Sequence, residues 1–543
     1  MPSSSSPSAF ARVAALPASL ADSFTPSDPI RVVEVSHKYL PPGPPNVSVA
    51  SLGLAWLGLV CWPSARDELG AGAVIGAPSA PIPIHEKEES QRGKQAASWC
   101  AIADSQVENI TGLPEFTTPG GPNNYVMKNV RREGQKDAGG TVAAVYGRAA
   151  WIGGQPRPLP YLPRNARANT PVDKAWTQGF FPGLLWLTLE RERLIKGSLP
   201  WPYTTDDLES MAREWQASFR KHARTAINHD QGFRFASSYG RELKLTGNEE
   251  CKTVLIEAAE SLWDRYDPKI GCIRSWNQMK KVGVPDKYRR DNQNEHFLVI
   301  VDNLMNLDFL FDVSEWTGDN KYRDMAISQA DKMQTAHVRP DGTTWHVVNF
   351  GHDGQVLERM THQGYSDDSC WSRGQAWAIY GYAQMSHRTG RKDFLATTRK
   401  VADAFLSRLE SSGLPAWDFD APRNPLVYDT SAATITASGL LILYRVLRDH
   451  DPQAADHYLS SAFDLIDSVN RECRAPPAKL EDGKVNWGEG GWEPILMHST
   501  INGNEHAEEP SMDTGLVYAD YYYAEFGNEA IKLRDELKKT LKN

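Results

Sequence analysis

Three short segments of the sequence concentrate the side chains best suited to proton transfer. They are Asn228–Phe233, Val299–Leu307 and Thr361–Trp377, and each mixes acids or amides with apolar residues. In the second segment Asp302 interrupts an apolar run, where a bare charge is costly to bury. If burial raises its pKa, this carboxyl group can donate a proton near neutral pH. Asp302 is therefore a candidate general acid, and a buried salt bridge or helix cap is the alternative.

The third segment is the richest in polar and aromatic chemistry. Its seventeen residues, Thr361–Trp377, include His, Gln, two Asp, Arg and two Trp, directly before an apolar stretch. Arg373 is suited to a two-pronged contact with a carboxylate, which lysine cannot match. Trp371 and Trp377 lie on or near the same helical face as Arg373, at spacings of two and four. The tryptophans can form a sugar-binding platform or simply pack in the core.

Helices must position these segments, because apolar residues recur at helical spacing throughout the chain after Pro171. No convincing strand hairpin interrupts them. A nearly all-apolar helix repeatedly reaches a glycine turn and is followed by a helix with one polar face, as at Gly318, Gly390 and Gly527. The pattern predicts helices near residues 173–195, 206–227, 247–264, 293–316, 320–336, 370–388, 392–410, 430–447, 453–470, 510–526 and 528–541.

An inner apolar helix followed by an outer amphipathic one, repeated about six times, predicts an all-α fold of the (α/α)6 barrel type. A helical solenoid is the alternative. Its repeats keep a fixed period, whereas the repeat length here is irregular. In a closed ring, the loops before the inner helices line the central cavity, so the three polar segments are expected to meet there.

Composition limits the classes of protein and partner. The 543 residues are 41% hydrophobic and 23% charged, as in ordinary globular proteins, which excludes a wholly disordered or multi-spanning membrane chain. The net charge of −9 predicts neither nucleic acid nor membrane as a partner. Six scattered Cys residues and no basic leader indicate a reducing, cytoplasmic location. The apolar run Val47–Trp62 is shorter than the ~20 residues that a membrane span needs.

Two regions are expected along the chain. Residues 1–165 contain Ser/Pro clusters and long stretches without helical period, which predicts an irregular N-terminal extension. Residues 166–543 carry the helical pattern and are predicted to form the barrel.

The three polar segments resemble those of a known family, the unsaturated glucuronyl hydrolases of glycoside hydrolase family 88. The similarity extends roughly from Pro171 to the C-terminus. Its long third motif is too specific to arise readily by chance. The matching runs are His229–Phe233, Asp302–Asn306 and His362–Trp377, with further similarity at Ala175–Gly183, Ile273–Trp276 and His337–Gly342.

The resemblance implies a fold and a reaction. The family fold is an (α/α)6 barrel, and its substrates are lyase products that end in a 4,5-unsaturated uronic acid. The implied reaction hydrates the vinyl ether: an acid protonates C4, water adds at C5, and the hemiketal opens to release the neighbouring sugar. By the family's pattern Asp302 is the general acid/base and Asp230 the second essential acid. No metal or cofactor is implied.

The resemblance also implies a substrate subsite. From its charge and position, rather than from the resemblance, Arg373 is the expected contact for the uronate carboxylate. The residues expected to line the subsite are Trp176, Trp276, His346, His362, Gln363, Trp371, Arg373 and Trp377.

The N-terminus departs from the family's pattern. Residues near Arg31–Pro45 resemble the family's first helix, so the extension is expected to contribute the first barrel helix at about residues 28–45. Residues Asn46 to about Leu113 have no counterpart, and are either an inserted segment or translated non-coding sequence.

Other functions stay open on the sequence. An unsaturated rhamnogalacturonyl hydrolase or a sugar epimerase would use the same kind of barrel. A non-catalytic carbohydrate-binding barrel would need the aromatic residues but not Asp302. The parent polysaccharide, its sulfation and the oligomeric state are not encoded in any spacing.

Overall fold

The computed structural model describes residues 176–197, 204–284, 290–475, 479–481, 484–486, 494–508 and 510–542. The expected N-terminal extension, its helix at about 28–45 and the run Val47–Trp62 lie outside these residues.

Within the described chain, eleven α-helices form two layers around a common axis. The inner layer is α6 (Phe180–Leu194), α8 (Tyr239–Thr246), α10 (Leu307–Thr317), α12 (Ser372–Thr389), α14 (Thr430–Leu447) and α16 (Val517–Lys542). The outer layer is α7 (Thr205–Ala217), α9 (Glu250–Trp263), α11 (Lys321–Ala336), α13 (Lys392–Leu406) and α15 (Pro452–Glu472).

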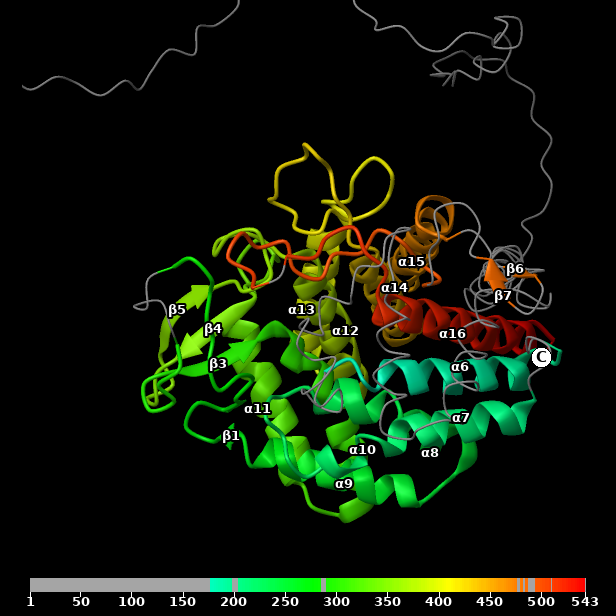
Figure 1. Cartoon of the computed structure of the whole chain (residues 1–543), viewed down its shortest axis with the longest axis horizontal. Helices are drawn as coiled ribbons and strands as arrows, with labels where there is room; N and C mark the ends of the chain where they lie inside the picture. Colours follow the sequence, from blue (N-terminus) through cyan, green and yellow to red (C-terminus); the bar gives the residue numbers. More distant parts are fainter. Residues whose placement is uncertain are drawn as a thin grey trace, which may run out of the picture. The chain divides into compact units, whose positions relative to one another are not determined.

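The inner helices close into a ring. Each contacts the next directly or, between α8 and α10, through the helical turns η3 (Gly232–Ala236) and η5 (Val301–Asn306). Figure 1 shows α16, drawn red, beside α6, drawn cyan, and extensive contacts join these two helices. The predicted (α/α)6 barrel is thus confirmed.

The division into layers follows from the side chains. Helices α12 and α14 are buried over nearly their whole surface, as an apolar helix between two neighbours must be. Helices α13 and α15 bury a single stripe and expose their charged faces. Two predicted glycine turns are confirmed: Gly318 and Gly390 have positive φ angles of 71° and 64° and end α10 and α12.

The expectation that no strand hairpins interrupt the helices is wrong. The antiparallel sheet β3-β4-β5 consists of Phe297–Ile300, Val347–Phe350 and Val356–Met360. The predicted helix at 293–316 therefore begins as a strand, continues as η5 and becomes helical only at Leu307. A buried run of four apolar residues has no periodicity that separates strand from helix. Two-stranded pairs form from β1 (Tyr266–Asp267) with β2 (Cys272–Ile273) and from β6 (Lys479–Glu481) with β7 (Lys484–Asn486).

The C-terminal helices also differ from the prediction. A break was expected at Gly527, but α16 runs without interruption from Val517 to Lys542. A glycine inside a helix costs only about 1 kcal/mol, which packing against α6 and α14 can offset. Residues 510–516 are not helical.

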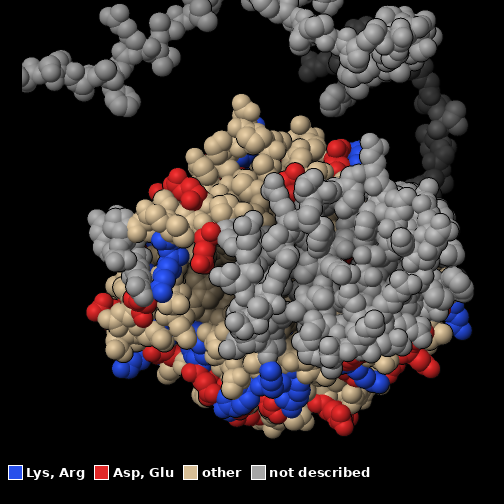
Figure 2. Space-filling view, in the orientation of Figure 1, with Lys and Arg blue, Asp and Glu red and all other residues tan. Residues whose placement is uncertain are grey.

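One described helix, α14, is long and apolar enough to cross a membrane, but 83% of its apolar window is buried inside the protein. That burial is what a central barrel helix requires. Figure 2 shows acidic and basic side chains interspersed over the described surface that faces the viewer.

Close packing of α12 against η5 leads to a first prediction. A Cβ atom on Gly381 would lie 2.5 Å from the Cβ of Leu304, in the turn that carries Asp302. Gly381→Ala should therefore lower the free energy of unfolding by about 1–3 kcal/mol through overpacking. Gly240 in α8 is the matched control, because its added Cβ would meet nothing closer than 3.9 Å. In denaturant unfolding, Gly240→Ala should be neutral or stabilising; equal losses in both variants would contradict the packing argument.

Candidate active site

Two short turns bring the candidate acids together. Asp302 lies in η5, between strand β3 and helix α10, and Asp230 lies just before η3. The backbone N–H of Gly232 donates to Asn306 Oδ1 at 2.8 Å, which ties the turns to each other. A Cβ at Gly232 would lie 2.7 Å from the carbonyl oxygen of Met305, so only glycine allows this close approach.

Both acids are buried and hold their protons unusually well. Asp230 and Asp302 are each only 7% exposed. Burial raises the pKa of Asp302 to about 7, against the opposing positive charge of Arg373. Burial, and then the charge of Asp302, raises the pKa of Asp230 to about 7. Neither acid forms an ion pair with Lys or Arg among the described residues, so the salt-bridge alternative for Asp302 fails.

A neutral histidine flanks each acid. His229 Nε2 lies 3.3 Å from Asp230 Oδ1, and His346 Nε2 lies 3.9 Å from Asp302 Oδ2. Burial lowers the pKa of His229 to about 3 and that of His346 well below its usual value. The backbone N–H groups of His362 and Gln363 point at His346 Nδ1, at 3.2 and 3.4 Å. The ring proton of His346 is therefore assigned to Nε2, facing Asp302.

Aromatic rings form the walls beside these groups. The His346 ring lies between Trp371 and Trp276, with centroid distances of 4.4 and 5.9 Å. Trp276 also contacts His362 edge-on, at 5.3 Å. On another side Phe233 lies 5.3 Å from Trp176 and 4.9 Å from Trp377.

Several buried polar atoms of this cluster have no hydrogen-bond partner among the described residues. Such groups are rare, because leaving them unpaired costs free energy. They include both donors and acceptors, a combination that a hydroxylated ligand can satisfy. The atoms are Asp302 Oδ2, His346 Nε2, His362 Nδ1 and Trp371 Nε1.

Arg373 has a different place from the expected one. It is fully buried, and Nη1 donates to Asp429 Oδ2 at 2.5 Å. Further bonds reach the carbonyl oxygens of Thr500 and of Ile501, the latter at 2.6 Å, and its guanidinium lies 4.5 Å from the Trp371 ring. Because the guanidinium already binds Asp429 and two backbone carbonyl oxygens, it does not fit the predicted two-pronged contact with a substrate carboxylate. Arg373 instead packs against Trp371, and its positive charge opposes the rise in the pKa of Asp302.

The remaining polar residues form the loops around the cluster. Gln363 Nε2 donates to the carbonyl oxygen of Ile501 at 3.1 Å, which joins its loop to the segment before α16. Lys281 Nζ lies 3.0 Å from Asp367 Oδ1, and its charge helps burial to lower the pKa of His362 to about 4. No pattern in the sequence predicted this position of Lys281. Asp513, which precedes α16, is 61% exposed and paired with His498, so it is not part of the buried cluster.

Asp429 is a residue that the sequence analysis missed. Besides binding Arg373, its side chain accepts from the backbone N–H of Ser431 and caps α14. Its position directly before an apolar inner helix is the signal that could have found it. No group of three or more His, Cys, Asp or Glu side chains that could hold a metal ion occurs in the described part of the chain.

A ring of helix pairs, with two raised-pKa carboxylates in an aromatic-walled cluster at its inner turns, defines a sugar-cleaving α/α-barrel enzyme. The profile of glycosyl hydrolase family 88 matches residues 176–441. This match and the similarities below place the chain in that family, as the three motifs indicated, and it is a glycosidase.

The relatives support this assignment. An unsaturated glucuronyl hydrolase of Formosa agariphila is 35% identical over 375 residues, which span 67% of this chain and 81% of that protein. An unsaturated chondroitin disaccharide hydrolase of Streptococcus pyogenes serotype M1 is 30% identical over 361 residues, spanning 64% and 79%. The crystal structure of an unsaturated glucuronyl hydrolase specific for heparin matches with a TM-score of 0.57 and 29% identity, covering 77% of this chain and 98% of that one.

The buried ion pair below the site gives a second prediction. Asp429→Asn keeps the size of the side chain but leaves the Arg373 charge buried without its carboxylate. The free energy of unfolding should fall by about 3–5 kcal/mol, measured by denaturant titration. Glu472→Gln, which removes the exposed Arg471–Glu472 pair, is the control and should change stability by less than about 1 kcal/mol. A loss at Asp429 no larger than in the control would show that the ion pair is not structural.

Proposed function

We propose that this enzyme removes the 4,5-unsaturated uronic acid from the non-reducing end of oligosaccharides made by polysaccharide lyases. The observation that carries the proposal is the state of Asp302, a buried carboxyl group with a pKa of about 7 and an unpaired oxygen. Such a group is protonated for a large fraction of the time at neutral pH, as a proton donor must be. The names of the relatives describe the same class of substrate.

The reaction follows from the polarity of the vinyl ether. Protonated Asp302 gives its proton to C4, and positive charge develops at C5, where the ring oxygen shares it. Water then adds to C5 while the Asp302 carboxylate removes its proton, so the enzyme returns to its starting state. The hemiketal opens and releases the neighbouring sugar.

The surrounding residues have supporting roles in this proposal. Asp230 orders substrate hydroxyl groups, and it is coupled to Asp302, whose negative charge raises the pKa of Asp230. The indole N–H group of Trp371 is an unpaired donor for the sugar, whereas that of Trp377 interacts with the Asp302 carboxyl group and opposes the rise of its pKa. Trp176, Trp276, His346, His362 and Gln363 complete the subsite. Arg373 acts through Trp371 and its electric field, without touching the substrate.

Loss of the double bond tests both the activity and the role of Asp302. Incubation with lyase-generated disaccharides should decrease the ultraviolet absorbance of the conjugated bond. Asp302→Asn should abolish turnover and retain binding, because the amide fills the same space but cannot donate a carboxyl proton. Asp520→Asn is the matched control, since burial also raises the pKa of Asp520 to about 7 but backbone N–H groups of Ile495 and Leu496 hold it elsewhere.

The outcomes are distinct. Full activity in Asp302→Asn would overturn the catalytic assignment, and inactivity of both variants would point to folding rather than chemistry. Unchanged absorbance with chondroitin, heparin, hyaluronan, glucuronan and pectin products would contradict the proposed function. The panel also identifies the parent polysaccharide, on which the names of the relatives differ.

The pKa of Asp302 predicts how the rate depends on pH. The proton donor is the neutral acid, so its fraction falls as pH rises through about 7. Above that pH, kcat/KM should decline about tenfold per pH unit, whereas an acid with an ordinary carboxyl pKa would be ionised by pH 5. Initial rates between pH 5 and pH 9 measure this limb. A rate that stays constant to pH 9 would exclude Asp302 as the donor. The cytoplasmic location and the absence of nucleic acid or membrane partners stay predictions.

A further inference from the structure

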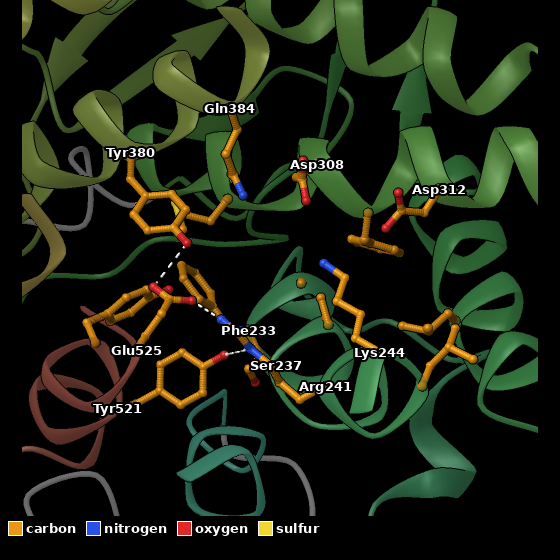
Figure 3. A pocket seen from close by; sticks show the side chains of 18 of the residues that line it. Phe233, Ser237, Arg241, Lys244, Asp308, Asp312, Tyr380, Gln384, Tyr521 and Glu525 are labelled. Atoms are coloured by element: carbon orange, nitrogen blue, oxygen red, sulfur yellow. Dashed lines mark hydrogen bonds and ion pairs between the residues drawn. The ribbon is translucent and has the colours of Figure 1, made fainter. Parts of the chain in front are cut away.

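A second cavity, of about 340 Å³, lies further along the inner helices than the catalytic acids. Its lining comes from α8, α9, α10, α12 and α16 together with the turns η3 and η5 (Figure 3). On α12 it is lined by Tyr380 and Gln384, which lie three and seven residues beyond Trp377.

A single layer of side chains separates this cavity from the active site. Phe233 and Tyr522 line the cavity, and their rings lie 4.9 and 5.5 Å from Trp377 on the other side. Neither Asp230 nor Asp302 is part of the lining. The cavity is therefore a separate chamber.

The charges that line the chamber are balanced. Arg241 is paired with Glu525 and donates to the Tyr521 hydroxyl at 2.9 Å. Asp308 and Asp312 share the guanidinium of a neighbouring arginine, at 2.7 and 2.6 Å. The three basic residues of the lining equal the three acidic ones in number: Arg241, Lys244 and Lys252 against Asp308, Asp312 and Glu525. Because charges of both signs are balanced, the lining gives no net attraction to an anion or to a cation, and it suits a neutral ligand.

Two polar groups of the chamber could bind a ligand, and one of them is a buried atom without a partner. The side-chain oxygen of Gln384 is buried and accepts no hydrogen bond from any described residue. The Lys244 ammonium is exposed, its charge acts on Asp308 and Asp312, and Figure 3 shows it extending toward these two acids. The Gln384 oxygen needs a donor, and the ammonium can donate to an acceptor on a ligand. A hydroxyl group can serve as either.

Apolar surface completes the lining. The apolar residues of the lining include Leu243, Leu255, Met305, Phe309 and Trp316. A few placed polar groups in an apolar chamber are typical of small-ligand sites, whose volumes begin at about 300 Å³. A sugar ring has this character too, with hydroxyl groups at its edge and C–H groups on its faces.

We propose that this chamber is a second binding site, for a neutral hydroxylated ligand of the size of one monosaccharide, held between Lys244 and Gln384. The proposal does not depend on the reaction carried out at Asp302. A ligand in the chamber would contact Phe233, whose ring also packs against Trp377 of the proposed sugar subsite.

Equilibrium dialysis of the full chain with labelled D-glucose, D-galactose and N-acetyl-D-galactosamine tests the site. Lys244→Met and Gln384→Leu should each weaken binding of at least one of these sugars about tenfold or more, because each removes one hydrogen-bonding group. Lys269→Met, at an exposed lysine that does not line the chamber, is the control and should leave binding unchanged. Because Lys244 is exposed, its variant tests the site without disturbing the core.

Binding that is lost in both chamber variants but kept in Asp302→Asn supports the second site. Three results would overturn it: no saturable binding of any of the three sugars, binding unaffected by Lys244→Met and Gln384→Leu, or tighter binding of D-glucuronate than of D-glucose. Hydrolysis of the unsaturated disaccharide is measured in the same variants. Loss of sugar binding in the chamber is thereby distinguished from loss of the proposed reaction at Asp302.

Discussion

The cost of burying two carboxyl groups side by side is the constraint on which the described barrel depends. Asp230 and Asp302 are almost excluded from water, and among the described residues their only ion-pair partners are histidines. Their neighbours His229 and His346 are kept neutral by the same burial. The positive charge of Arg373 is near enough to be felt by Asp302 but is bound to Asp429. The protons are therefore held by exclusion of water rather than by partner charges, which suits a group that must give one away.

Irregular backbone makes this arrangement possible. A regular helix through residues 297–306 would point successive side chains in different directions around its axis. Strand β3 followed by η5 instead places Asp302 just before the first turn of α10. The amides of Asn303 and Asn306 bind each other at 2.7 Å, and Asn306 also binds η3. These polar contacts fix the separation of the two turns within an apolar barrel. Apolar packing sets the ring of helices, and amide hydrogen bonds set the acids within it.

The sequence predicted what is local and missed what is distant. Asp302 in an apolar run, the glycine turns and the apolar inner helices are patterns within a few residues, and they led to the right fold. β3 was missed because four apolar residues do not distinguish strand from helix. Arg373 was assigned to the substrate because its partner Asp429 lies 56 residues further along, where no spacing rule reaches. The lone Lys281 near His362 depends likewise on a loop contact that no pattern encodes.

The charge of the proposed substrate adds a final step. A uronate brings its own carboxylate into a cluster that already holds two acids, and a nearby negative charge raises the pKa of a carboxyl group further. Substrate binding should therefore favour the protonated form of Asp302, because burial has already raised the pKa of this group to about 7. The field of Arg373 opposes this effect and prevents the proton from being held too tightly for transfer to carbon. An arginine bound directly to the substrate would cancel the uronate charge, whereas one bound to Asp429 leaves that charge to act on Asp302.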